Sequence, residues 1–212
     1  MAVGYHAVEK GRLTGGEVPI VIGCGPVGLA VIAALKLKGV GPIIATDFSP
    51  VRRAMAEQMG ADVVLNPTDH SPYEKWEAVA VPDGVDLSNP MAAMLAESQI
   101  KPCVVFECVG VPGLLQQVLE GTPRHARVVV VGVCMEADQI EPIYGINKEL
   151  NLQFVLGYSP DEFETTLHNI AEGRTHVDPL ITGKIGVEEV PNAFEELASP
   201  ERHVKILVEP WR

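Results

Sequence analysis

Three glycines, Gly23, Gly25 and Gly28, stand within six residues, and the carboxylate of Asp47 follows 19 residues after the last of them. Glycine loses much backbone entropy on folding and offers no side chain to pack, so such a cluster needs a compensating reason. In a G-x-G-x-x-G turn the first glycine allows a tight bend, the second lets the backbone approach a pyrophosphate, and the third permits close helix–strand contact. The chemistry that this spacing indicates is the binding of a dinucleotide.

The segments around the glycines suit that chemistry. An apolar run over 18–22 precedes them, and a helix-forming run over 26–38 follows. The first turn of a helix offers free N–H groups and the positive end of the helix dipole, which favour a phosphate without any basic side chain. A second strand over 42–46 ends beside Asp47, whose carboxylate can accept hydrogen bonds from both ribose hydroxyls and would repel a 2′-phosphate. We therefore predict a site for NAD rather than NADP.

Arg52 and Arg53 weaken this preference for NAD. A guanidinium close behind the acidic residue is the natural partner of a 2′-phosphate. Both arginines fall within the next predicted helix, over 50–58, whereas the carboxylate lies at the strand end itself. We therefore predict that Arg52 contacts the 3′-hydroxyl or lies over the adenine, and NADP stays open as the alternative cofactor.

Apolar, β-rich runs alternate with helix-forming segments along the chain, which is typical of a parallel sheet covered by helices on both faces. Right-handed crossovers between successive strands would place those helices. We predict an α/β fold with a doubly wound, six-stranded parallel sheet of the Rossmann type. The predicted strands cover residues 18–22, 42–46, 62–65, 103–107, 127–132 and 152–156. The predicted helices between them cover residues 26–38, 50–58, 90–98, 112–120 and 143–149.

Two parts of the chain depart from this alternation. Residues 67–90 are rich in Pro, Asp and Ser and have weak periodicity, which predicts a long surface excursion between the third and fourth strands. Beyond residue 160 the alternation loosens, with further elements expected at 160–172, 181–185, 188–198 and 203–208. We expect 1–175 to form an NAD-binding domain and 176–212 to be a C-terminal remnant of a second domain.

The charge and hydrophobicity of the chain exclude some classes of binding partner. The 212 residues carry a formal net charge of −12 at pH 7, with acidic residues spread along the chain. This charge argues against nucleic acid or an anionic membrane surface as the main partner. No apolar run reaches the roughly 18 residues needed to cross a bilayer, and the N-terminus lacks the pattern of a signal peptide. We expect a cytoplasmic protein whose four cysteines remain thiols.

The cysteines and histidines do not have the spacing of a metal site or a catalytic centre. Cys103 and Cys108 lie five residues apart along one predicted strand, so their side chains point to opposite faces. Cys24 and Cys134 fall near strand ends, where thiols are more often small packing residues. Glu107, at the end of the fourth strand, is expected to be satisfied by backbone N–H donors. We predict neither a metal ligand nor a catalytic residue in this chain.

Several segments resemble, in order and at about the expected spacing, the cofactor domain of the medium-chain, zinc-dependent alcohol dehydrogenases, including their polyol and sorbitol-type members. The resemblance begins with EVPIVIGCGPVGLAVIAALKLKGVGPIIATDFSPVRRAMAEQMGADVVLNP. It continues with FECVG at 106–110, VVVVGVC at 128–134 and VDPLITGKIGVEEVPNAFEELASPERHVKILVEP at 177–210. It covers nearly the whole chain apart from residues 67–101, and several separate matching segments make it specific.

The resemblance implies that the chain is the NAD-binding portion of an enzyme that transfers hydride between an alcohol and NAD. It implies that Cys108 and Val109 line the adenine side. Residues 131–133 would border the nicotinamide, whose carboxamide would be held by the backbone around Val155 and Gly157. With the motif residues, the predicted cofactor-binding set is Gly23, Gly25, Pro26, Val27, Gly28, Asp47, Phe48, Arg52, Cys108, Val109, Val131, Gly132, Val133, Val155 and Gly157.

In this family a preceding catalytic domain supplies the zinc ligands and the proton relay. We therefore expect zinc and an alcohol substrate only together with that domain, and NAD binding without turnover for this chain alone. The family pairs its cofactor domains through the sixth strand, here about 151–157, which implies a homodimer. Two other functions stay open: a non-catalytic nucleotide-binding or oligomerisation module, and an NADP-dependent quinone reductase-like protein. The latter is disfavoured because such proteins usually lack an acid at the position of Asp47.

Overall fold

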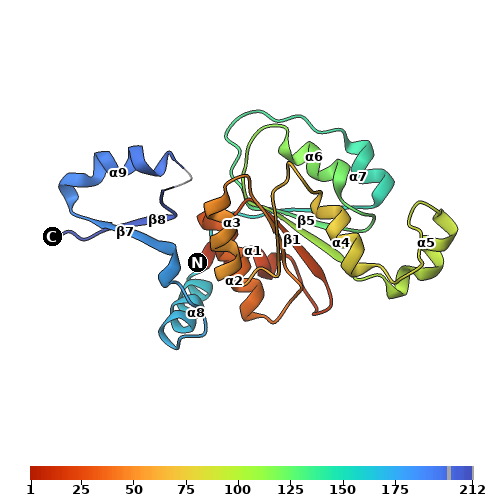
Figure 1. The fold of residues 1–212 in the computed structure, drawn as a ribbon, viewed down its shortest axis with the longest axis horizontal. Coiled ribbons are helices and arrows are strands. Elements are labelled where there is room, and N and C mark those ends of the chain that lie inside the picture. Colours follow the sequence, from red (N-terminus) through yellow and green to blue (C-terminus); the bar gives the residue numbers. More distant parts are fainter. Residues whose placement is uncertain (200–201, 212) are drawn as a thin grey trace.

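The computed structural model describes residues 1–199 and 202–211. Within them, six parallel strands form the central sheet in the order β3-β2-β1-β4-β5-β6 (Figure 1). The strand order reverses between β1 and β4, as in a doubly wound Rossmann sheet, and this confirms the predicted fold class. The strands are β1 (Val18–Ile22), β2 (Ile44–Thr46), β3 (Val63–Leu65), β4 (Cys103–Glu107), β5 (Arg127–Val130) and β6 (Asn151–Phe154).

Two apolar cores cover the two faces of this sheet. On one face, α2 (Pro26–Leu37) and α3 (Pro50–Gln58) pack on the central strands, and on the other face lie α4 (Pro72–Ala80) and α6 (Leu114–Gly121). Helix α7 (Pro142–Lys148) packs beside α6. Strands β1 and β4 are buried on both faces, which explains their nearly continuous apolar sequences.

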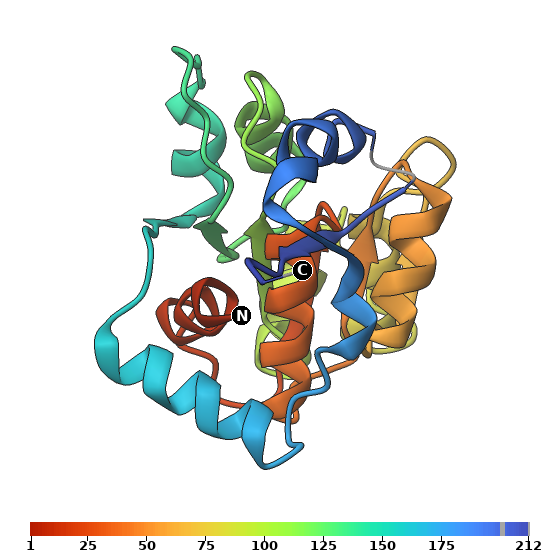
Figure 2. The same cartoon turned by 90° about the vertical axis from the view of Figure 1, so that its left-hand side faces the viewer.

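Helix α1 (Ala2–Lys10) was not among the predicted elements, and it packs directly on α2. The two backbones touch, because a Cβ on Gly4 would overlap the backbone of Ala30. On its other side α1 meets α8 (Pro160–Ala171), as Figure 2 shows for the dark red and cyan helices. Nδ1 of His6 lies 2.9 Å from the carboxylate of Glu162, so this histidine joins two helices.

The prediction of a surface excursion over residues 67–90 is wrong, because this stretch contains α4. The side chain of Ser71 caps the helix by accepting a hydrogen bond from the N–H of Tyr73. Trp76 and Ala80 are then buried against the sheet. The helix was not predicted because its apolar face is short and polar residues flank it in the sequence. Helix α5 (Pro90–Ala96) and a short 3-10 helix, η1 (Glu97–Gln99), follow before β4.

Several strands are shorter than predicted, and backbone hydrogen bonding explains why. The N–H groups of Val131 and Gly132 both donate to the carbonyl of Glu107, so the chain turns there and β5 ends at Val130. Strand β6 similarly ends at Phe154 rather than at residue 156. Pro42 has no N–H to donate, and β2 begins two residues after it.

Beyond α8, the chain forms a separate two-stranded parallel sheet of β7 (Ile181–Ile185) and β8 (Lys205–Val208), with α9 (Val190–Leu197) between them (Figure 2). Of the segment 176–212, residues 200, 201 and 212 lie outside the described residues. No helix in the described ranges combines the length and apolar character that a membrane span requires.

Candidate functional site

The last residues of five strands lie in one row across the sheet. Ile22 is in register with Thr46 and with Glu107, and the row continues through Val130 to Phe154. The residue after each of these therefore lies at the same carboxyl edge, where parallel sheets of this type bind ligands. The edge from β2 to β6 spans four strand spacings of about 4.8 Å each. These five residues are Gly23, Asp47, Cys108, Val131 and Val155, all of them in the predicted cofactor set.

Each of the three motif glycines has a different structural surrounding. Gly23 has a φ of +89°, a left-handed conformation that strains any residue with a Cβ. A Cβ on Gly28 would overlap the carbonyl oxygen of Gly23, so the first turn of α2 lies against the strand end. Gly25 is open instead, because the nearest atom to its Cβ position is Nη1 of Arg52 at 3.9 Å. The exposed backbone at Gly25 is where a pyrophosphate could approach.

The N-terminus of α2 leaves donors available at that point. Gly25 is the N-cap and supplies no side-chain cap, and the first turn contains no acidic residue. Pro26 has no N–H, so the N–H groups of Val27 and Gly28 are the ones without a partner inside the helix. Together with the positive end of the helix dipole they can hold an anion, and a diphosphate fits this end of α2.

The carboxylate of Asp47 is held rigidly beside this helix. Its Oδ2 accepts a hydrogen bond from the N–H of Cys24 at 2.8 Å, and its Oδ1 accepts one from Ser49 at 2.8 Å. The side chain is 10% exposed. A carboxylate has about four acceptor positions, so each oxygen can still accept a sugar hydroxyl. The two backbone donors thus fix the orientation of the Asp47 carboxylate.

The two adjacent arginines have different roles. Nη1 of Arg53 donates to the carbonyls of Asp47 and Phe48, at 2.8 and 2.7 Å, and so fixes the turn after β2. Nη1 of Arg52 lies 4.0 Å from Oδ2 of Asp47 and close to Gly25. The sequence showed no signal that separates the two, because the difference depends on where the turn carbonyls point. Phe48 projects its ring into solvent.

The turns after β4 and β5 are joined backbone to backbone. Glu107 is buried, and its Oε1 accepts from the N–H groups of Val109 and Gly110 at 2.7 and 2.8 Å, as expected for this carboxylate. Gly110 has a φ of +74°, and a Cβ there would overlap the backbone of Gly132 and Val133. Sequence reasoning did not single out Gly110, although its position just after a strand end was a usable signal. This contact leaves the apolar side chains of Val109 and Val133 exposed at the carboxyl edge.

The thiols of Cys24 and Cys108 at this edge are packing groups. Cys134 is not the packing residue that the sequence predicted, because it is exposed and its Sγ donates to the carbonyl of Glu136. Burial, together with the charge of Asp47, raises the pKa of Cys24 to about 12, and its Sγ donates to the carbonyl of Thr46. Burial likewise raises the pKa of Cys108 well above its ordinary value. Cys103 lies in the core of the opposite face, as predicted. In the part of the chain that the structure describes, no three His, Cys, Asp or Glu side chains converge on a possible metal site, so these residues do not fit zinc.

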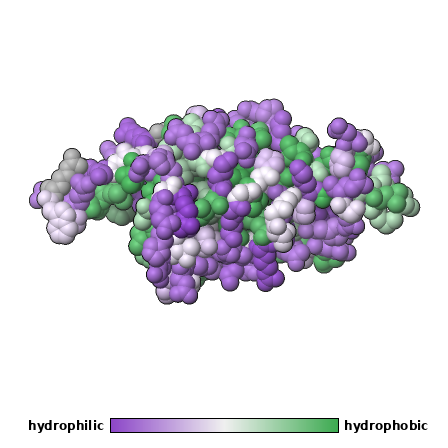
Figure 3. All heavy atoms as spheres, turned by 90° about the horizontal axis from the view of Figure 1, so that it is seen from below, coloured by the Kyte–Doolittle hydropathy of each residue, from purple (hydrophilic) through white to green (hydrophobic). Residues whose placement is uncertain are grey.

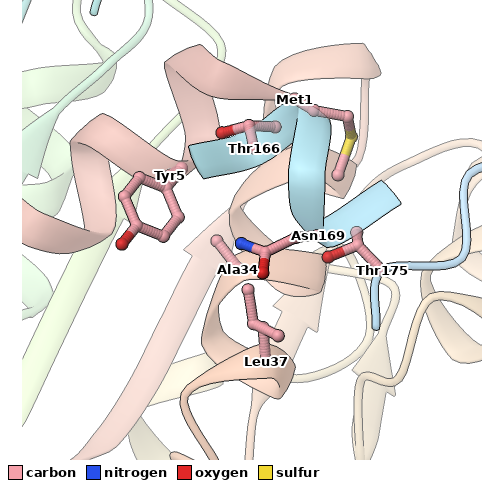
Figure 4. Close-up of a pocket in the computed structure, with 7 residues that line it drawn as sticks. All are labelled: Met1, Tyr5, Ala34, Leu37, Thr166, Asn169 and Thr175. Atoms are coloured by element: carbon pink, nitrogen blue, oxygen red, sulfur yellow. The ribbon is translucent and has the colours of Figure 1, made fainter. Parts of the chain in front are cut away.

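A small hollow lies between α1, α2 and α8 (Figure 4). Its volume is about 10 Å³, and a hollow of that size holds about one water molecule. The amide of Asn169 and the hydroxyls of Thr166 and Thr175 line it. The hollow is a packing defect between helices and not a ligand site.

Comparison with known proteins decides the family. Residues 26–172 match the family model described as zinc-binding dehydrogenase. The chain belongs to the zinc-binding dehydrogenase family. It is 32% identical over 210 residues to (R,R)-butanediol dehydrogenase of Bacillus subtilis (strain 168), covering 99% of the chain and 55% of that protein. It is 27% identical over 195 residues to sorbitol dehydrogenase of Bos taurus, covering 92% of the chain and 50% of that protein.

Solved structures of related dehydrogenases agree with the fold. The crystal structure of 2R,3R-butanediol dehydrogenase from Bacillus subtilis has a TM-score of 0.76 at 32% identity and covers 99% of this chain and 55% of that one. A protein from Sinorhizobium meliloti 1021 solved with bound NADP has a TM-score of 0.76 at 25% identity, with 99% and 57% covered. The family resemblance seen in the sequence is confirmed. The chain spans about half the length of the curated relatives that it matches.

Proposed function

We propose that this chain holds NAD along the carboxyl edge of its sheet and is the cofactor-binding part of a dehydrogenase for alcohols or polyols. The observation that carries the proposal is the fixed carboxylate of Asp47 beside the open backbone of Gly25 and the uncapped N-terminus of α2. The butanediol and sorbitol dehydrogenases among the relatives support the class of substrate.

The order of strands suggests how the cofactor would lie. The adenosine ribose belongs at Asp47 after β2, and the diphosphate at the N–H groups of Val27 and Gly28 after β1. The nicotinamide then extends toward the turns after β5 and β6, around Val133 and Gly157. NAD supplies the hydride chemistry when it is bound, and the chain supplies position and electrostatics. The exposed side chains of Val109 and Val133 would exclude water beside the rings.

Preference for NAD follows from charge at the ribose. A 2′-phosphate would come close to the carboxylate of Asp47, and both charges would be negative. Arg53 is already engaged by two turn carbonyls, which leaves Arg52 as the cation close to that carboxylate. Because one related structure holds NADP, the two cofactors have to be compared directly in one experiment.

Isothermal calorimetry with NAD⁺ and with NADP⁺ tests the proposal. We expect wild-type protein to bind NAD⁺ more tightly than NADP⁺. Asp47→Asn should weaken NAD⁺ binding roughly 10- to 100-fold, the equivalent of losing charge-assisted hydrogen bonds of about 1.5–3 kcal/mol, and should weaken NADP⁺ binding less. Failure of wild-type protein to bind either dinucleotide would overturn the proposal.

Asp62→Asn is the matched control. Like Asp47, Asp62 accepts a backbone N–H bond, from Ile43 at 2.7 Å, but at the start of β2 rather than at its end. It should therefore leave NAD⁺ affinity within about twofold of wild type, because it lies outside the proposed site. Thermal unfolding of both variants shows whether any loss of binding reflects a loss of folded protein.

We further propose that the segment 176–212 belongs to the substrate-binding part of the complete enzyme, and that this chain alone does not oxidise alcohols. The described residues supply no ligand set for zinc, and the relatives are about twice as long. NADH formation from butanediol or sorbitol by the purified chain, with added zinc, would contradict the second statement.

The cofactor parts of two chains would pair through β6. This strand lies at the edge of the sheet, and all four of its residues are exposed, including the apolar Leu152 and Phe154. An exposed apolar edge strand is a ready template for association. We propose a homodimer formed along this edge, and the mass of the protein in solution tests it.

A further inference from the structure

A second cleft lies at the opposite, amino edge of the sheet, far from the motif glycines. Its volume is about 710 Å³, which falls within the range of roughly 300–1,000 Å³ that is common for small-molecule sites. Its walls come from α5, from the start of β4 and from the turn that joins α6 to β5.

Part of the cleft lining is apolar. Trp76, Met94 and Ile100 form it, together with the buried thiol of Cys103. Helix α5 also presents Met91 outward, and apolar side chains are visible at this end of the molecule, on the right in Figure 3. This part of the lining can hold the apolar part of a ligand without desolvating polar groups.

The lining also carries positive charge. Lys101 precedes β4, Arg124 precedes β5, and Lys148 ends α7, so three separate parts of the chain each bring one cation to the cleft. Nη1 of Arg124 donates to the carbonyl of Asn147 at 3.0 Å, which holds that side chain in place. Among the lining residues the one carboxylate is that of Glu97, which lies 3.2 Å from His125. The whole chain has a net charge of −12, but the cleft lining carries more positive than negative groups. The cleft therefore favours an anion.

The charged groups around the cleft leave donors for such an anion. Nζ of Lys148 donates to the carbonyls of Leu119 and Glu120 at the end of α6, which uses two of its three protons. Burial lowers the pKa of Lys148, and the charge of Glu120 opposes that shift. Glu149 lies on the far side of His125, at 3.5 Å, and does not line the cleft.

Trp76 lines the cleft and carries an unpaired polar group. Its indole Nε1–H is buried and has no acceptor among the described residues. The same indole provides an optical reporter inside the cleft wall.

We propose that this cleft binds a small amphipathic anion, an apolar body that carries one carboxylate or phosphate group. The body lies against Trp76 and α5, and the anionic group lies among Lys101, Arg124 and Lys148. This site is separate from the proposed NAD site, because the two occupy opposite edges of the same sheet.

Octanoate, octyl phosphate and the neutral octanamide are the probes that test it. The chain has two tryptophans, and Trp211 is 94% exposed, so Trp211→Phe leaves Trp76 as the reporter. We expect a saturable change in Trp76 fluorescence with an anionic probe, and at least tenfold weaker binding of octanamide. The tighter of the two anions identifies the head group. Equal binding of octanamide, or no saturable change with either anion, would overturn the proposal.

Variants locate the binding. Lys101→Gln combined with Arg124→Gln should weaken binding of the preferred anion at least fivefold, because two of three cations are removed. Lys36→Gln, at the end of α2, is the matched control and should leave it unchanged. Thermal unfolding checks that each variant is folded. Unchanged affinity in the double variant, or displacement of the anion by NAD⁺, would place the ligand elsewhere and overturn the proposal.

Discussion

The centre of the sheet and its β6 edge are built by the same parallel pairing, yet they differ in what covers them. Phe106 in β4 is 0% exposed, whereas Phe154 in β6 is 61% exposed, although both are the same residue type in strands of one sheet. The helical layers cover the central strands on both faces, but they leave β6 open. Pairing with one neighbour is therefore enough to form a strand, and the apolar side chains of β6 remain available to a partner.

The largest expected effect compares these two phenylalanines. Phe106→Ala should lower the free energy of unfolding by about 3–5 kcal/mol, because it leaves a cavity where the ring packs near Gly11. Phe154→Ala should change the free energy of unfolding of the monomer by no more than about 0.5 kcal/mol, because the side chain is mostly in solvent in the single chain. Urea denaturation followed by circular dichroism measures both, and similar losses would refute the contrast.

The second prediction concerns two glycines of the central turn. Gly28→Ala should destabilise the fold by about 3 kcal/mol, because its Cβ would overlap the carbonyl of Gly23. Gly25→Ala should cost less than about 1 kcal/mol in stability, because the nearest atom lies 3.9 Å away, but it should weaken NAD⁺ binding. The same denaturation assay and calorimetry separate the two. A folded Gly28→Ala protein with wild-type stability would contradict the contact.

The third prediction tests a buried ion pair at the amino edge of the central strands. Burial alone raises the pKa of Glu17, but hydrogen bonds from Thr14 and Arg127 outweigh burial and hold it at about 2. Since this folded pKa lies below the ordinary value of 4.5, the stabilisation is present above pH 4.5 and is lost as the pH falls toward 2. Glu17→Gln should therefore be about 2–3 kcal/mol less stable than wild type at pH 7.

Unfolding measured between pH 7 and pH 3 checks this prediction, since the difference between the two proteins should shrink below pH 4.5. Glu9→Gln is the control. Glu9 pairs with Lys38 at the surface, where such pairs contribute about 0–1 kcal/mol, so its effect should be small. A difference for Glu17→Gln that stays constant with pH would show that the ion pair is not its cause.

The smallest effect on folding, and the sharpest test of the exposed edge, comes from Phe154→Asp. We expect self-association to weaken at least tenfold, because a charge would be buried in the proposed β6 interface. Sedimentation equilibrium measures it. Phe194→Asp, on the exposed face of α9, is the matched control and should not change the mass. An unchanged mass for Phe154→Asp would exclude β6 as the interface.

Much of the fold could be predicted from local patterns, and the misses have physical causes. The six strands and the glycine turn follow from apolar runs and spacing. Helix α4 was missed because its burial depends on two side chains, Trp76 and Ala80, that become buried only when the sheet is formed. The role of Arg53 was missed because it depends on the direction of two turn carbonyls.

The amino-acid sequence by itself determined the succession of the six strands, the turn at Gly23 to Gly28 and the acid at the end of β2, because these depend on backbone conformation and short-range periodicity. Only the tertiary structure decided which strand ends share one row, that Gly110 and Gly132 touch, and that a charged cleft opens at the opposite edge. Those features join residues far apart in the chain, and their contacts exist only after parallel pairing and close packing have placed them.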